Sequence, residues 1–313
     1  MQTQSGAIVS KLLTTASNGY FPTGFIAEKI LPAVYVPQTT GLIGKYSNNH
    51  LRIVNTVHTG KGVYRRLEAV TVSSDTYSIE DHGLEDIITE NDMRNFESPY
   101  DAEVDSTISL SLAHMISKEY ALASTLQNPS IITQGVTLSG TAQYNNLDHA
   151  DSDPLGDKIA ADNAIEAAVG GPSNTAIMSM RTFRYLSRHK QILGALGFTA
   201  TPPMGLSVAQ LATVLQVDQV LVSDASYNSA KEGQADVLAN IWGKDVIYAR
   251  IFAPALRQKT LGYEMRKSGT SPRQVYTYMP TMPVNSRGVI VTDNYDQLIL
   301  NAGCAYLIQD AVA

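Results

Sequence analysis

The sequence predicts an α+β protein with one long helix, one long β-hairpin and a domain in which strands and helices alternate. Residues 98–128 combine a helix start, apolar residues at three- and four-residue steps, and a helix stop. Residues 45–79 are rich in Val, Thr, Tyr and Ile around a central Gly-Lys-Gly, which is typical of a β-hairpin. Residues 153–223 alternate between helical and strand-like runs, which indicates a mixed α/β domain.

Composition excludes several classes of protein. The chain has 313 residues, of which 44% are hydrophobic and 17% charged, so it can bury a sizeable core. The single cysteine, Cys304, excludes an intrachain disulfide framework. No apolar run follows a basic start, so secretion and membrane insertion lack support. The formal charge of −6 argues against a dedicated nucleic-acid binder.

The charge is distributed unevenly along the chain. Residues 1–74 carry seven Lys or Arg and two Asp or Glu, whereas residues 75–157 carry two and sixteen. The remaining residues carry fourteen and eleven. The asymmetry indicates either two separately solvated faces or a basic arm that lies on an acidic body.

Residues 1–40 contain several Gly and Pro residues and only short apolar clusters, which predicts an extended arm with one or two helical turns. Its apolar residues would be poorly covered in an isolated chain, so a partner surface is expected. These residues are Ile30, Leu31, Val34, Tyr35 and Val36.

The hairpin predicted between Lys45 and Ile79 is polar and basic. Its cationic residues Arg52, Lys61, Arg65 and Arg66 leave few apolar positions for a core. We therefore expect the hairpin to project from the body, with an ordinary solvated surface hairpin as the alternative.

An acidic stretch, residues 81–95, precedes the long helix and is expected to contain a short helix from Leu84 to Asp92. In the long helix, Ser98 is the expected N-cap and Pro99 the first helical residue, and Asn128 before Pro129 ends it. Lys118 and Glu119 are expected outside its buried stripe. The predicted stripe consists of Val104, Ile108, Leu112, Met115, Ile116, Ala123 and Leu126.

The rest of the chain reads as alternating elements. We expect a strand within residues 132–140, a helix from the capping Asp153 to Val169, a strand over 175–180, a helix over 182–190, a helix capped by Ser207, and a strand over 219–223. Residues 237–252, 256–280 and 288–313 are expected to be mainly β.

The sequence contains no complete catalytic motif. The GLIGKYS segment has Tyr46 where a phosphate loop needs Ser or Thr, and neither a GxSxG elbow nor an HExxH helix occurs. Four carboxylates could place oxygen ligands around calcium, although their spacing differs from an EF-hand; a capped helix start with solvated carboxylates is the alternative. They are Asp148, Asp151, Asp153 and Asp157. The scattered histidines, His114 among them, are expected to be packed or surface residues, and no catalytic, cofactor or metal residue is predicted.

In the order of its sequence segments, the chain resembles the major capsid proteins of tailed bacteriophages, which have the Hong Kong 97-type shell fold. The resemblance covers nearly the full chain. It is carried by the segments FIAEKILPAVYV, YSIEDHGLEDII, SGTAQYNNLDHADSDP, GGPSNTAIMSMRTFRYLSRHKQI, LSVAQLATVLQVDQVLVSDASYN, IWGKDVIYARI and AGCAYLIQDAV, in that order. One departure is Tyr144, where relatives often carry tryptophan.

The resemblance implies a Hong Kong 97-like capsid fold with four parts. Residues 1–40 would be the N-terminal arm and 41–80 the extended β-hairpin loop that reaches over a neighbouring subunit. Residues 81–135 and 255–313 would form the peripheral domain, with the spine helix at 99–127, and residues 136–254 the mixed α/β axial domain.

The implied function is a non-enzymatic major capsid protein, without a cofactor, that assembles as pentamers and hexamers into an icosahedral virion shell around double-stranded DNA. Assembly would occur in the host cytoplasm with a separate scaffolding protein and a portal, and with a decoration protein as an optional partner. Some relatives crosslink a loop lysine to an asparagine, but no crosslink is predicted here. The residues expected to contact neighbouring subunits are Lys45, Arg52, Lys61, Arg65, Arg66, Glu85, Asp86, Glu97 and Glu119.

Two alternatives remain open from the sequence. An encapsulin-like bacterial compartment shares the fold but encloses cargo enzymes. A soluble metal-dependent enzyme would be centred on the carboxylates between residues 148 and 157.

Overall fold

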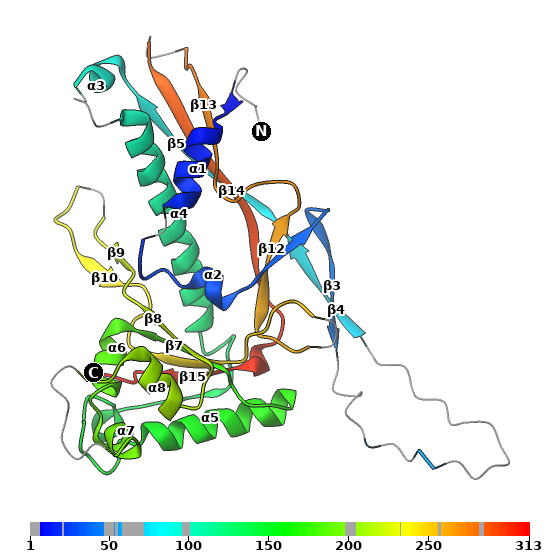
Figure 1. Ribbon diagram of the computed structural model, residues 1–313, viewed down its shortest axis with the longest axis vertical. Helices are drawn as coiled ribbons and strands as arrows, with labels where there is room; N and C mark the ends of the chain where they lie inside the picture. Colours follow the sequence, from blue (N-terminus) through cyan, green and yellow to red (C-terminus); the bar gives the residue numbers. More distant parts are fainter. Residues whose placement is uncertain are drawn as a thin grey trace.

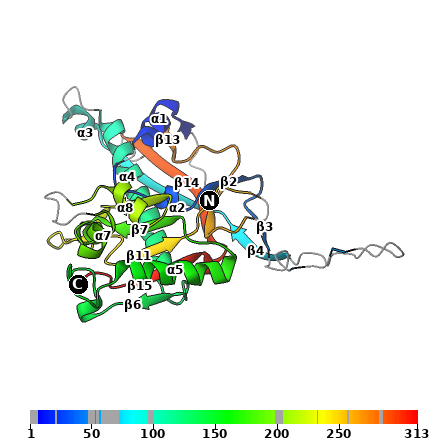
Figure 2. The ribbon, with the colours of Figure 1, turned by 60° about the horizontal axis from the view of Figure 1, so that its bottom comes forward.

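A computed structural model gives the arrangement of the chain (Figure 1). It describes residues 7–20, 22–46, 53, 56–57, 72–95, 101–197, 205–231, 233–255, 258–281 and 285–313. These residues form two sheet-and-helix layers from which a β-hairpin projects (Figures 1 and 2). None of the helices among them is both long and apolar enough to cross a membrane.

The first layer is a six-stranded sheet organised around one long strand, β14. One side of β14 pairs with β5, and its other side pairs first with β13 and then with β12. Each of the following strands is hydrogen-bonded to the next: β1 (Ile8–Val9), β13 (Gln274–Tyr278), β14 (Arg287–Ile299), β12 (Gly262–Lys267) and β2 (Ala33–Val36); β5 (Glu80–Ile88) lies on the opposite side of β14. All pairs are antiparallel except β2 with β12.

The long helix α4 (Ala102–Leu126) lies along one face of this sheet, and α1 (Lys11–Gly19) packs beside it (Figure 1). The helix begins later than the sequence predicted, because Asp101 rather than Ser98 is the N-cap and accepts from the backbone N–H of Glu103. The predicted start at Ser98 and Pro99 lies outside the described residues. The helix ends with the C-cap Gln127, next to the expected stop.

The buried face of α4 differs from the predicted apolar stripe. Met115, Ala123 and Leu126 are buried as expected, but other stripe members such as Val104 and Ile108 are only partly buried. The buried residues of α4 also include polar side chains, namely Ser106, Thr107, Ser111, His114, Lys118 and Glu119. A polar buried face was not predicted, because its partners come from strands more than 90 residues away in the sequence.

The second layer is a five-stranded sheet with four helices around it (Figure 2). Its strands, in spatial order, are β6 (Gly135–Thr137), β15 (Ala305–Gln309), β11 (Val246–Ala249), β7 (Thr175–Ser179) and β8 (Gln219–Ser223). Its helices are α5 (Pro154–Val169), α6 (Met180–Leu186), α7 (Lys190–Ala195) and α8 (Val208–Val214). Every residue of β7 and β11 is buried, which explains their continuous apolar runs.

Local signals define the helix ends in this layer. Asp153 caps α5 through the backbone N–H of Gly156, and Gly170 ends the helix with a positive φ of 84°. Ser207 and Gln210 form a capping box at the start of α8. The helix predicted over 182–190 is instead two helices, because α6 ends at Leu186 and His189 caps α7.

Two hairpins and two short helices complete the described chain. The hairpin of β3 (Thr40–Tyr46) and β4 (Val72–Ser78) projects from the body, and β9 (Ser226–Asn228) pairs with β10 (Leu238–Asn240) beside α4 (Figure 1). Helix α2 (Ala27–Ile30) sits on the middle of α4, and α3 (Glu90–Asn95) leads toward its start.

Two predictions about the N-terminal half are wrong. The short helix expected from Leu84 to Asp92 is mostly strand β5, because pairing with β14 along its whole length outweighs local helix preference. The arm is not a largely uncovered segment: Ile30 and Leu31 are fully buried in the main core, and β2 is part of the six-stranded sheet. Tyr35 does remain exposed.

The main core joins the two layers. It extends from β7 and β11 of the five-stranded sheet to α2 and the C-terminal half of α4, and includes Ile30, Leu122 and Leu126. The last strand, β15, lies between β6 and β11. Residues 305–309 therefore pair with the sheet of the 136–254 segment, although the sequence-based division grouped them with residues 81–135.

Candidate assembly surfaces and the charged interior

The β3–β4 hairpin is the main projecting surface of the described chain (Figure 2). Its strands pair in register from Thr40 with Ser78 to Tyr46 with Val72. Lys45 lies 3.7 Å from Asp75 across the hairpin, and both side chains are about 40% exposed. Leu42 is 69% exposed, so the root of the hairpin offers polar and apolar groups that the monomer leaves uncovered.

Five of the nine predicted contact residues lie outside the described residues. They are Arg52, Lys61, Arg65, Arg66 and Glu97. The remaining four lie in different places, with Lys45 on the hairpin, Glu85 and Asp86 on β5, and Glu119 in the interior.

Glu85 and Asp86 are exposed and point to opposite faces of the six-stranded sheet. Asp86 accepts a 2.6 Å hydrogen bond from the Ser106 hydroxyl on α4. Glu85 accepts a hydrogen bond from the Tyr278 hydroxyl on the other face. Neither carboxylate has a cationic partner among the described residues.

Glu119 does not present its carboxylate to a neighbouring subunit, so that expectation is wrong. The residue is 1% exposed and joins three separate segments. Its carboxylate accepts from the backbone N–H groups of Ile26 (3.0 Å) and Ala27 (2.8 Å) at the start of α2, and from the indole N–H of Trp242 (2.6 Å). Burial raises the pKa of Glu119, although these donors oppose the rise.

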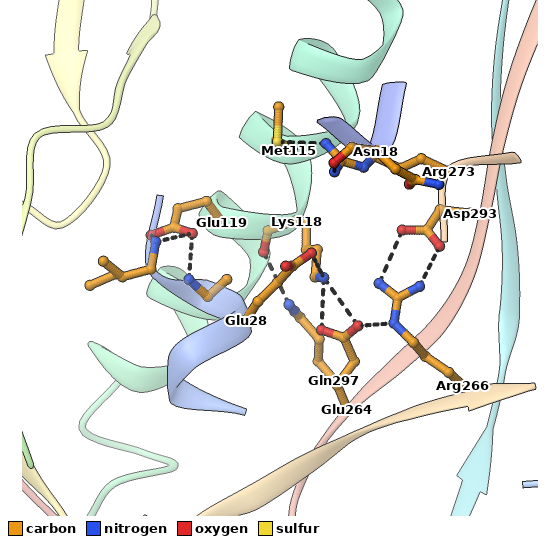
Figure 3. Close-up of polar contacts among 12 residues, drawn as sticks. Asn18, Glu28, Met115, Lys118, Glu119, Glu264, Arg266, Arg273, Asp293 and Gln297 are labelled. Atoms are coloured by element: carbon orange, nitrogen blue, oxygen red, sulfur yellow. Dashed lines mark hydrogen bonds and ion pairs between the residues drawn. The ribbon is translucent and has the colours of Figure 1, made fainter. Parts of the chain in front are cut away.

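A buried charge cluster lies on the other side of α4 (Figure 3). Lys118 reaches Glu264 on β12 at 2.8 Å and Glu28 on α2 at 3.1 Å. Arg266, two residues along β12, contacts the same Glu264 and forms a bidentate pair with Asp293 on β14 at 2.7 and 3.2 Å. We call Lys118, Glu264, Arg266 and Asp293 the charge cluster.

The charges in the charge cluster balance. Burial alone would lower the pKa of Arg266, but Glu264 and Asp293 outweigh it and raise the pKa. Burial would likewise raise the pKa of Asp293, but the Arg266 guanidinium lowers it below its usual value. Arg266 and Asp293 therefore stay ionised at neutral pH, and the charge cluster ties α4 to two strands.

A second buried arginine fixes the N-terminal segment. Arg273, between β12 and β13, has a φ of 48° and donates to the carbonyls of Tyr20 (3.1 Å) and Asn18 (3.4 Å). These carbonyls lie at the C-terminal end of α1, where a cation is favourable. Arg273 thus holds α1 against α4 and the sheet.

The residues considered for metal binding have separate structural roles. Asp148 pairs with Lys190 at 2.6 Å, Asp151 accepts from Thr141, Asp153 caps α5, and Asp157 accepts a 2.8 Å hydrogen bond from Tyr144. Among the described residues, no three His, Cys, Asp or Glu side chains are grouped to hold a metal ion. Tyr144 is fully buried, as an aromatic anchor should be.

The buried contact between Ser152 and His189 is not arranged to activate the serine as a nucleophile. The Ser152 hydroxyl lies 3.1 Å from Nε2 of His189, whose Nδ1 accepts from the backbone N–H of Gln191. In the neutral imidazole the proton is then on Nε2, so His189 donates to Ser152 and cannot take its proton. The serine hydroxyl donates to the carbonyl of Gln143.

Sequence reasoning missed the charge cluster and the three contacts of Glu119. Strand β12 did carry a signal, because Glu264 and Arg266 share one face of a strand that otherwise reads as core. Nothing local pairs them with Lys118 or Asp293, which are 146 and 27 residues away in sequence.

Curated relatives match nearly the whole chain. It is 24% identical to the major capsid protein of Burkholderia phage BcepMu and 24% identical to that of Pseudomonas phage JBD67, each over 96% of both chains. No family model matches the sequence.

Solved structures give the fold. A phage-related protein from Bordetella bronchiseptica RB50 superposes with a TM-score of 0.74 and 22% identity, over 98% of this chain and 99% of the other. The capsid structure of Cyanophage P-SCSP1u superposes with a TM-score of 0.59 and 12% identity, over 99% and 92%. The chain has the Hong Kong 97-type capsid fold. It is a homologue of phage major capsid proteins.

The charge cluster lies under α4. Glu119, through Ile26, Ala27 and Trp242, connects the start of α2, α4 and the segment between β10 and β11.

Proposed function

We propose that this chain is the shell-forming subunit of a tailed-bacteriophage capsid, assembling as pentamers and hexamers into an icosahedral shell around double-stranded DNA. The observation that carries the proposal is the full-length similarity to phage major capsid proteins, together with a fold shared with a solved phage capsid. The projecting hairpin supports it, since a hairpin with an exposed apolar root can be buried by another copy of the chain.

Each of the four parts of the fold is proposed to have its own role in the shell. Residues 1–40 act as the arm, 41–80 as the extended loop, 81–135 and 255–313 as the peripheral domain, and 136–254 as the axial domain. Within this division, β15 supplies a strand to the axial sheet. The loop carries the cations Arg52, Lys61, Arg65 and Arg66, and its partner surface on a neighbour is acidic.

The proposed partners are further copies of the chain, a separate scaffolding protein, a portal and packaged DNA without sequence-specific contacts, with a decoration protein as an optional partner. Assembly takes place in the host cytoplasm, and the subunit performs no catalysis. The net charge of −6 suits a wall that encloses DNA without binding it tightly.

Electron microscopy of the purified full-length protein, with light scattering in parallel, tests this function. Closed shells of uniform size are expected, with or without a co-expressed scaffold. A monodisperse monomer under every condition, including with the scaffold present, would refute the shell function.

An encapsulin-like compartment is the second candidate, because a holo encapsulin complex from Synechococcus elongatus PCC 7942 superposes with a TM-score of 0.52 and 10% identity over 97% of this chain. The curated relatives favour the phage capsid. Neighbouring genes separate the two: a terminase and a portal support the phage shell, whereas a ferritin-like or peroxidase gene with a cargo tail supports the compartment.

A further inference from the structure

One segment of this acidic chain carries cations and no carboxylate side chains. Residues 167–217 contain four Lys or Arg and no Asp or Glu, although the whole chain has 29 acidic and 23 basic residues. The segment supplies β7 and three helices of the five-stranded layer, α6, α7 and α8 (Figure 1). These helices therefore have no acidic side chain of their own to balance their cations.

Three of the four cations, Arg181, Arg184 and Arg188, lie in a row along α6 and the turn that follows it. Their spacing of three and four residues places them on one face of the helix. The backbone N–H of Arg188 bonds to the carbonyl of Tyr185 at 3.1 Å, so the helical turn continues beyond Leu186. With a rise of about 1.5 Å per residue, the row is roughly 10 Å long. We call these three arginines the α6 basic face.

The α6 basic face is exposed and is not neutralised by acidic side chains. All three arginines are exposed, and none of them forms an ion pair with an Asp or Glu within the described part of the chain. Arg181 donates to the backbone oxygen of Ala313. The fourth cation of the segment, Lys190, pairs with Asp148 at 2.6 Å and is not part of the row. The row therefore offers its charge to an external anion.

The row does not stabilise α6. Like charges four residues apart, such as those of Arg184 and Arg188, repel one another on a helix surface and destabilise it. The opposite side of the helix holds it in place, because Thr182 and Leu186 are buried and Leu186 belongs to the main core. A bound anion would remove the repulsion between the arginines.

Double-stranded DNA is the anion that fits the row. Its phosphates recur along each strand, so guanidinium groups in a line can each meet a phosphate. Arginine binds phosphate through two parallel hydrogen bonds, a geometry that lysine lacks. The α6 basic face of a second copy is excluded as the partner, because like charges repel.

We propose that the α6 basic face contacts phosphates of the enclosed double-stranded DNA and lies on the inner surface of the shell. The contact is independent of DNA sequence, since phosphates carry no direct sequence information. The net charge of −6 keeps DNA from the rest of the subunit, so the contact is confined to this face. The inference rests on the shell function proposed above, and it specifies which surface of the subunit faces the DNA.

The first test measures binding of a short fluorescent DNA duplex to the unassembled full-length subunit by anisotropy at several salt concentrations. Arg184→Gln with Arg188→Gln removes two phosphate contacts, so the slope of log K against log salt concentration should become less steep by about 1.8. Circular dichroism checks that the variant is folded. The matched control, Lys29→Gln with Arg94→Gln, removes two exposed cations from α2 and α3 and should leave the slope unchanged.

Two outcomes of this titration would overturn the inference. One is a folded Arg184 and Arg188 variant with the slope of wild type, and the other is a wild-type subunit that does not bind the duplex. A second duplex of different sequence should bind wild type with the same affinity as the first. A strong preference between the duplexes would contradict a contact made through phosphates.

Polyglutamate separates DNA from an acidic protein partner. At equal total charge it should bind wild type more weakly than the duplex does, because a disordered chain loses conformational entropy when it is held against the row. Tighter binding of polyglutamate, lost in the Arg184 and Arg188 variant, would assign the α6 basic face to an acidic protein segment and overturn the inference.

Electron microscopy of closed wild-type shells gives the last test. The map should place α6 on the inner surface. A position on the outer surface would refute this inference while leaving the shell function standing. If the wild type formed no shells under any condition, the shell function itself would fail, whereas the duplex titration would still report on the α6 basic face.

Discussion

Replacing Glu119 by alanine should destabilise the unassembled subunit by about 4 kcal/mol. The change removes the carboxylate that accepts from three buried donors, the backbone N–H groups of Ile26 and Ala27 and the indole N–H of Trp242. Each unsatisfied buried donor costs about 1–3 kcal/mol. The lower half of that range applies here, because water can enter the space left by the side chain and the cost of burying the carboxylate is recovered.

Urea unfolding followed by circular dichroism measures the loss. Trp242 is the single tryptophan of the chain, so its fluorescence reports directly on this site in the same titration. Amide exchange at Ile26 and Ala27 should accelerate more than exchange in the buried strand β11. Glu166→Ala on α5, an exposed carboxylate, is the matched control and should change stability by less than about 0.5 kcal/mol. A Glu119→Ala variant as stable as this control would refute the reasoning.

Three further predictions concern the charged residues. Burial raises the pKa of Glu119. The stability that this carboxyl group contributes is therefore complete below its unfolded pKa and is lost as pH rises through its folded pKa. In urea titrations at several pH values, the difference in the free energy of unfolding between wild type and Glu119→Gln should shrink as pH rises through this range. Asp293→Asn should cost about 3 kcal/mol at pH 7, because it leaves Arg266 without its bidentate partner. The pKa of Asp293 is lowered in the folded protein. The difference in the free energy of unfolding between wild type and Asp293→Asn is therefore present above the unfolded pKa and should disappear as pH falls through the folded pKa. A difference that does not depend on pH would contradict this prediction. Asp153→Ala should lower the free energy of unfolding by about 1 kcal/mol, because α5 loses its N-cap. Calorimetric calcium titrations of the variant and of wild type should give the same result. Calcium binding by wild type alone would favour a metal site.

The sequence was sufficient for elements whose signals are local. The strand over 219–223, the Asp153 cap and the Ser207 cap lie where the residues predicted them, because capping side chains and short apolar runs act within a few positions. The long helix was recognised for the same reason. Its first turn was misplaced, since Asp101 competes as a cap with Ser98.

Elements that depend on distant partners could not be predicted in the same way. Residues 84–92 look helical by composition, but most of them pair as a strand with β14, which lies about 200 residues away in the sequence. Lys118 and Glu119 were expected outside the buried stripe of the helix, and Glu119 at a contact with a neighbouring subunit, because charged side chains are rarely buried without partners. Their partners, Trp242 and Glu264, follow more than 100 residues later.

The position of β15 has a consequence for the order of synthesis. This strand lies between β6 and β11, yet its residues 305–309 follow all the other strands of the sheet in the chain. The five-stranded sheet therefore lacks an interior strand until residues 305–309 have left the ribosome. A nascent chain, or one terminated before residue 305, has β11 with an open edge and an incomplete sheet. The topology thus delays completion of the core until every other strand of this sheet has been synthesised.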